Sequence, residues 1–239
     1  MKSKYLYVIY PGACGGNHVC NMISLCDGFE QRVSNIKRPN YKEWLLSHYK
    51  KYNYFVKPYL YVNAHLSNQP DHVDKLYEIV SKEYALNPDD TLIIQGHLFN
   101  FWAACDNGIL EELGHDYKAI IMTHPPENSM PWKRIEAYGY QSSVQGYTFP
   151  LDICKSNPVG QPKQMSLEVN ENNGFQLDTV KFFTPEGSQY LRELLKQHFE
   201  VDLPLEADEL HSMWFKWMTY VLKPENIEYW NSKQSTNPN

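Results

Sequence analysis

Three histidines and one cysteine are the residues of this sequence best suited to chemistry, because each follows a short apolar run. They are Cys14, His18, His97 and His124. An imidazole titrates near neutral pH and can remove a proton from a hydroxyl group. A thiol at the start of a helix can have a lowered pKa and act as a nucleophile. We interpret His97 as a candidate general base, with a structural strand-end histidine as the alternative, and packing roles stay open for the other three.

A glycine-rich turn over residues 11–16 separates an apolar run at 5–10 from a segment with helical spacing that begins at Val19. A helix that starts directly after such a turn directs backbone N–H groups and a positive dipole end at it, which favours an anion such as phosphate. The glycines fit neither the dinucleotide fingerprint nor a Walker A loop, since Asn17 and His18 occupy the Lys and Ser/Thr positions. A tight turn without a ligand is the alternative. The candidate anion-binding residues are Gly12, Cys14, Gly15, Gly16, Asn17 and His18.

Positive charge that could hold an anion is scarce, because the chain has only four arginines. Lys133 and Arg134 follow the apolar run that ends at Thr123, and we include all three as candidate cofactor-binding residues. Zinc is the metal that a set such as His18, His97 and His124 would suit. The sequence has no HExxH motif and no short paired spacing, so we expect no metal.

Composition narrows the class of protein. The 239 residues are 42% hydrophobic and 14% aromatic, the mean hydropathy is −0.56 and the formal net charge is −6. This balance disfavours a protein that coats nucleic acid. Five cysteines without a CxxC pair indicate reduced thiols, and neither a signal peptide nor a membrane-spanning apolar run is present. We therefore expect a cytoplasmic protein that does not enter a membrane.

Three apolar runs, over residues 5–10, 91–97 and 117–123, predict buried strands separated by helical segments. Such alternation is typical of an α/β fold with a parallel β-sheet flanked by helices. We expect a single domain over 1–239, with an irregular insert or lid at about 140–174 and a frayed tail after about 231.

Further helices are expected within 41–50, 71–84, 98–113, 127–139, 186–199 and 210–221, and further short strands at 59–62 and 180–183. The helix after the strand at 180–183 is expected to have Thr184 as its N-cap and Pro185 at its first position. Three candidate segments follow the apolar runs and so fall at carboxyl ends of strands. They are the loop at 11–18, His97 and the stretch at 123–134. In a parallel sheet those ends lie at one edge, where ligands bind.

The order of these parts resembles the sulfotransferase family, which transfers a sulfuryl group from the nucleotide PAPS. Gly15-Gly16-Asn17-His18-Val19 resembles the Gly-Thr-Thr-Trp-Leu segment of the family's phosphosulfate loop. Gly96-His97-Leu98 resembles its Thr-His-Leu-Pro element, whose histidine is the catalytic base. Thr123-His124-Pro125-Pro126-Glu127 stands where the family has Arg-Asn-Pro and an acidic residue. The resemblance implies a P-loop NTPase/sulfotransferase-like fold, with PAPS as the nucleotide.

The chain departs from the family at its cations. Gly12 or Ala13 replaces the loop Lys or Arg, Thr123 replaces the arginine that holds the 3′-phosphate, and the partner serine falls near Pro131. Because charge stabilisation is usually the largest catalytic contribution, other cations would have to act, and Lys133 and Arg134 are near enough in sequence.

Three functions follow as expectations. The first is a divergent sulfotransferase-like enzyme whose His97 deprotonates an acceptor hydroxyl, with a nucleotide and a small-molecule or glycan acceptor as partners. The second is a non-catalytic relative with a binding or structural role, such as a component of a viral assembly. The third, a phosphoryl-transfer enzyme, is disfavoured because the Walker Lys and Ser/Thr are absent. The oligomeric state is left open.

Overall fold

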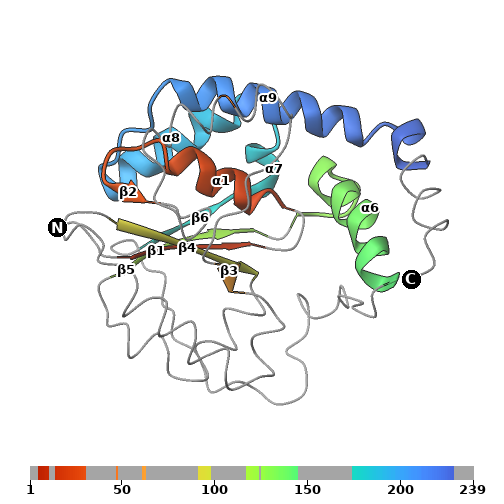
Figure 1. Cartoon of the computed structure of the whole chain (residues 1–239), viewed down its shortest axis with the longest axis horizontal. Coiled ribbons are helices and arrows are strands. Elements are labelled where there is room, and N and C mark those ends of the chain that lie inside the picture. Colours follow the sequence, from red (N-terminus) through yellow and green to blue (C-terminus); the bar gives the residue numbers. More distant parts are fainter. Residues whose placement is uncertain are drawn as a thin grey trace, which may run out of the picture.

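The computed structural model describes residues 5–10, 14–30, 47, 61–62, 91–97, 117–123, 125–144 and 174–228. They form a parallel β-sheet with helices packed on it, which is an α/β fold as the apolar runs predicted (Figure 1). The strands are β1 (Tyr5–Tyr10), β2 (Phe29–Glu30), β3 (Tyr61–Val62), β4 (Thr91–His97), β5 (Tyr117–Met122) and β6 (Gly174–Leu177). The three runs predicted as buried strands are β1, β4 and β5.

The strand order is β2-β4-β1-β5-β6, with β3 paired to β4 outside this path, and every pair is parallel. From β1 the chain goes to β2, towards one edge of the sheet, whereas from β4 it goes to β5, towards the opposite edge. Connections that diverge in this way create a crevice at the carboxyl ends of the two strands, which is the usual ligand position in open α/β sheets. Here that position lies between β1 and β4.

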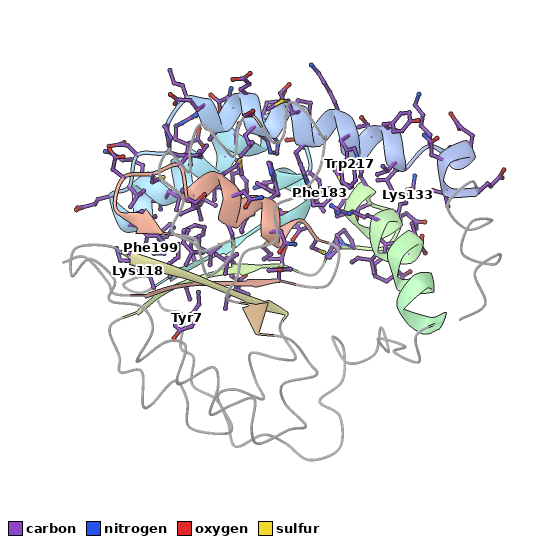
Figure 2. All side chains as sticks on the ribbon, in the orientation of Figure 1. Tyr7, Lys118, Lys133, Phe183, Phe199 and Trp217 are labelled. Carbon is purple, nitrogen blue, oxygen red and sulfur yellow. The ribbon has the colours of Figure 1, made fainter. Side chains whose placement is uncertain are left out.

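The helices are α1 (Gly16–Ile23), α6 (Met130–Val144), α7 (Thr179–Phe182), α8 (Gly187–Phe199) and α9 (Glu206–Val221). Figure 1 shows α1, α7, α8 and α9 over one face of the sheet, and α6 beyond the carboxyl edge. Side chains alternate between the faces of a strand. Leu6, Val8 and Tyr10 therefore join the core under these helices, whereas Tyr7 points to the opposite face (Figure 2).

The core is built from the helix-facing side of the sheet and the apolar stripes of α1, α8 and α9. On α9, Leu210, Trp214 and Met218 are buried, and they follow the helical spacing that the sequence shows. On α8, the corresponding residues are Leu191, Leu195 and Phe199. These stripes fix the position of α9 above α1, and thereby bring two distant parts of the sequence together.

The predicted strand at 180–183 is wrong, because residues 179–182 form helix α7 and the strand precedes it as β6. The reason is Asp178, whose carboxylate accepts hydrogen bonds from the backbone N–H groups of Val180 and Lys181 at 2.9 and 3.3 Å. This cap begins a helix at residues whose composition favours a strand. Thr184 does not cap α8 either, because its hydroxyl donates back to the Lys181 carbonyl at 2.8 Å.

Helix α6 is longer than predicted, since it continues to Val144 and so takes up the first five positions of the expected irregular insert at 140–174. The rest of that insert lies outside the described residues. So do the helices expected within 71–84 and 98–113, nearly all of the one expected within 41–50, and the expected frayed tail. Among the described helices, none is both long and apolar enough to cross a membrane.

Candidate functional site

The carboxyl ends of the central strands meet at one edge, as the sequence pattern predicted. Tyr10, the last residue of β1, pairs in register with His97, the last residue of β4. On the other side of β1, Ile9 pairs with Ile121, so that β5 ends at the same level. The backbone of His97 therefore lies beside the last residue of β1. Its side chain lies outside the described part of the chain, and its role as a base stays a prediction.

Helix α1 begins directly after Gly15, beyond the carboxyl end of β1. Gly15 is the N-cap and has φ 80°, a left-handed conformation that glycine adopts without steric cost. The N–H groups of His18 and Val19 donate to the Gly15 carbonyl at 2.9 and 3.1 Å. The helical acceptors of the Gly16 and Asn17 N–H groups would precede the helix. These two amides are therefore the donors that α1 can offer to an anion.

Aromatic rings pack closely on both glycines of this turn. A Cβ on Gly16 would lie 1.9 Å from Cδ1 of Tyr10, and one on Gly15 would lie 2.9 Å from Cζ2 of Trp214 and 3.4 Å from Cε2 of Phe183. The Tyr10 hydroxyl donates a hydrogen bond to Oδ1 of Asn17 at 2.8 Å. Both glycines are thus required by close packing as well as by the path of the turn.

His18 is fully buried in an aromatic and imidazole cluster formed with residues of α9. Its ring stacks on Trp214 with a centroid distance of 4.4 Å and an interplanar angle of 8°, and its Nε2 lies 3.2 Å from Nδ1 of His211. Nε2 of His211 is 2.8 Å from the Thr184 carbonyl, which can only accept, so this nitrogen carries the proton. Neutral His211 then accepts at Nδ1, and His18 donates from Nε2.

Both histidines are held neutral by their surroundings. Burial lowers the pKa of His18 well below its ordinary value, and the neighbouring His211 and the charge of Arg134 lower it further. Burial also lowers the pKa of His211, opposed by its hydrogen bond to Thr184 and by the charges of Asp208 and Glu186. The His18 side chain therefore packs against α9 and does not supply a cation to the site.

We expect the free energy of unfolding to fall as pH drops from 7.5 to 5.5. Below a pH of about 6.5 these two histidines become protonated in the unfolded chain, whereas in the folded chain burial keeps them neutral. The free energy of unfolding therefore falls by up to about 1.4 kcal/mol per pH unit for each histidine. Urea unfolding at several pH values measures this slope. His211→Gln, whose side chain offers the same donor and acceptor, should have a smaller slope than the unmodified chain. Equal slopes in the two proteins would contradict the inference that burial keeps His211 neutral.

Arg134 is the buried cation of the site. Its side chain is 6% exposed, its Cζ lies 5.6 Å from the centroid of the Trp217 ring, and its charge acts on His18 at the start of α1. The neighbouring Lys133 is exposed. Figure 2 shows Lys133 on α6 at the end of the molecule where Trp217 and Phe183 also lie. Of the two adjacent basic residues, the structure therefore buries only Arg134.

Two of the remaining predicted residues, Thr123 and Cys14, have local structural roles. Oγ1 of Thr123 accepts from the backbone N–H of Thr179 at 3.1 Å, and the Thr123 carbonyl accepts from the Thr179 hydroxyl, so Thr123 joins β5 to α7. Cys14 is completely buried, which favours packing over the nucleophile that its place before α1 suggested. Gly12 lies outside the described residues.

The described residues contain no group of three histidine, cysteine or acidic side chains placed to hold a metal ion. The side chains of His97 and His124 are not among them, so the three-histidine zinc set stays a hypothesis.

Neither His211 nor Trp214 was singled out from the sequence as part of the site. The helical spacing of His211 with Trp214 and Met218 was a signal that this histidine is buried. Its contact with His18 spans 193 residues of sequence and had no local signal.

No family model, curated protein or solved structure matches this chain.

Proposed function

We propose that this chain is a sulfotransferase-like protein of P-loop type that binds PAPS at the carboxyl edge of its sheet. The observation that carries the proposal is the start of α1, which follows the left-handed Gly15 directly after the central strand β1. A helix amino end at the diverging point of a parallel sheet is a common position for the phosphates of a nucleotide.

The donors present fit a phosphosulfate group. The N–H groups of Gly16 and Asn17 would hold its oxygens, as backbone donors do in phosphate loops. Buried Arg134 would supply the positive charge that the loop itself lacks, and exposed Lys133 would reach the outer phosphate. Thr123 would add its hydroxyl at the end of β5. The residues proposed to form this site are Gly12, Gly15, Gly16, Asn17, Thr123, Lys133 and Arg134, whereas Cys14 and His18 are buried and serve packing.

PAPS would supply an activated sulfuryl group, and the chain would supply a base and charge stabilisation. His97 would take the proton of an acceptor hydroxyl as the hydroxyl oxygen forms a bond to sulfur. The bond from sulfur to the bridging phosphate oxygen breaks at the same time, and adenosine 3′,5′-bisphosphate leaves. Arg134 would stabilise the negative charge that develops on that oxygen. The acceptor would be a small molecule or a glycan.

A second candidate is a non-catalytic relative with a binding or structural role. It is favoured by the packing of the turn, because Tyr10, Trp214 and Phe183 occupy the space beside Gly15 and Gly16. It is also favoured by the single buried arginine or lysine among the described residues, since the family uses several cations. In this case the anion site would serve recognition alone.

Sulfuryl transfer from radiolabelled PAPS to a panel of phenols, sugars and tyrosine peptides separates the two candidates. We expect transfer by the unmodified chain and loss of transfer in His97→Ala, with binding of adenosine 3′,5′-bisphosphate retained in both. Binding without transfer to any member of the panel would select the non-catalytic relative. Transfer that His97→Ala leaves intact would remove His97 as the base.

A further inference from the structure

A buried pair of histidines connects α1 with α9. His18 belongs to α1 and His211 to α9, and neither residue has exposed surface. Nε2 of His18 lies 3.2 Å from Nδ1 of His211, and the His18 ring also stacks on Trp214 of α9 with a centroid distance of 4.4 Å. Solvent can therefore protonate this pair only when the packing between the two helices opens.

The His211 ring has no room to turn towards solvent while α9 stays in place. A Cβ on Gly187 would lie 2.7 Å from its Nε2, and this nitrogen is 2.8 Å from the Thr184 carbonyl. The rings of Phe182 and Phe215 also lie against it, with centroid distances of 5.3 and 6.4 Å. Exposure of His211 thus requires a displacement of α9 itself.

The charged groups around the pair do not offset the cost of burying a positive charge. Burial lowers the pKa of both histidines, and the neighbouring imidazole and the charge of Arg134 on α6 lower the pKa of the α1 histidine further. The Thr184 carbonyl, Asp208 and Glu186 act in the opposite direction on the α9 histidine, but burial outweighs them. The Asp208 carboxylate is also paired with Arg192 at 2.8 Å. The closed pair is therefore neutral.

Helix α9 can separate from α1 without breaking the sheet. Figure 1 shows α9 on the far side of α1 and α8 from the strands, and its exposed side chains include Glu209, Ser212, Lys216 and Thr219. Every described strand precedes α9 in the sequence, so its release disrupts no strand pairing. Openings that release one element cost less free energy than global unfolding.

Proton uptake favours the open state over the closed one. Imidazoles in contact with water are protonated below a pH of about 6.5, whereas the closed pair is neutral. The ratio of open to closed chains therefore rises by up to about 10-fold per pH unit for each histidine.

We propose that the His18–His211 pair is a pH-sensitive switch, which holds α9 on α1 at neutral pH and releases it at mildly acidic pH while the sheet stays folded. The switch involves no ligand, so it is independent of the proposed function.

Native-state hydrogen exchange of the full chain at pH 7.5, 6.5 and 5.5, followed by mass spectrometry, tests this proposal. The exchange rate of an unstructured peptide at the same pH is divided by each measured rate, which gives a protection factor free of the chemical effect of pH. We expect the protection factors of α9 amides to fall by about 30–100-fold between pH 7.5 and 5.5. At pH 5.5 the amides of β1 and β5 should remain at least about 10-fold better protected than those of α9.

His211→Gln removes one titrating ring and keeps a hydrogen-bond donor and an acceptor. In this variant the fall for α9 should be no more than about 10-fold, because only His18 remains to take up a proton. His198→Gln is the matched control, since His198 is a partly exposed histidine on α8 whose ring stacks on Phe175 at 5.1 Å. The control should show the full fall of the unmodified chain.

Three results would overturn the proposal. Unchanged protection of α9 between pH 7.5 and 5.5 would show that the pair does not respond to acid. Equal protection factors for α9, β1 and β5 at every pH would show that only global unfolding exposes the pair. An equal fall in His211→Gln and the unmodified chain would show that other groups cause it. The first two results need only the unmodified chain, so the test does not depend on the folding of either variant.

Discussion

A Gly16→Ala chain should lose about 3 kcal/mol of folding free energy, a large part of the stability of a typical domain. The new Cβ would lie 1.9 Å from Cδ1, and 2.2 Å from both Cε1 and Cγ of the Tyr10 ring. The ring has little room to move, because Tyr10 is 4% exposed on the central strand and its hydroxyl is bonded to Asn17. Urea unfolding of the variant measures the loss.

Two further variants separate this clash from other effects. Asn17→Ala removes only the partner of the Tyr10 hydroxyl, and should cost about 1 kcal/mol. Tyr10→Ala removes the ring, so adding Gly16→Ala to it should cost far less than Gly16→Ala alone. Additive losses in the double variant, or normal stability of Gly16→Ala, would show that Tyr10 does not pack on Gly16. Loss of ligand binding in Gly16 variants would reflect this packing, so binding is better tested at Arg134.

Arg134→Met should weaken binding of adenosine 3′,5′-bisphosphate by about 100-fold, because hydrogen bonds to charged groups contribute about 1.5–3 kcal/mol each. Arg134 is buried, and methionine keeps the apolar stem while removing the charge. The pKa of His18 should rise in this variant, because the Arg134 charge contributes to lowering it. Isothermal titration measures the affinity, and a pH titration of the His18 ring signals measures the second effect.

Lys216→Met is the control for this change, since it removes an exposed positive charge from a residue outside the proposed site. An exposed cation contributes little at physiological ionic strength, so the affinity should fall by about 5-fold or less. Similar losses in both variants would indicate a long-range effect of net charge and would contradict a specific role for Arg134. An unchanged affinity in Arg134→Met would place the anion elsewhere.

The central sheet could be predicted from the sequence because its strands are continuous apolar runs, as is typical of buried parallel strands. The same rule placed the turn before α1 at the end of β1, where the register now sets Tyr10 beside His97. The rule of apolar runs did not predict β6 or α7, because there a single side chain determines the secondary structure. The Asp178 carboxylate begins a helix in a segment that otherwise has the composition of a strand.

The side chains that form the site were harder to predict, because their positions depend on how each helix is rotated about its axis and on long-range packing. Burial of Arg134 and exposure of Lys133 follow from the orientation of α6, which no sequence pattern fixes for two adjacent basic residues. The stacking of His18 on Trp214 requires α9 to lie above α1. That arrangement follows from the whole core, and from no local signal in either helix.

A thermal-shift titration of the full chain with adenosine 3′,5′-bisphosphate, beside adenosine 5′-monophosphate, is the measurement to make first. A ligand that binds only the folded state stabilises it by about 2.7 kcal/mol at 100 times its Kd, so Tm must rise with concentration. We predict a concentration-dependent rise with the bisphosphate and a smaller one with the monophosphate, which lacks the 3′-phosphate. No rise with either nucleotide at millimolar concentration would contradict a nucleotide site at the amino end of α1.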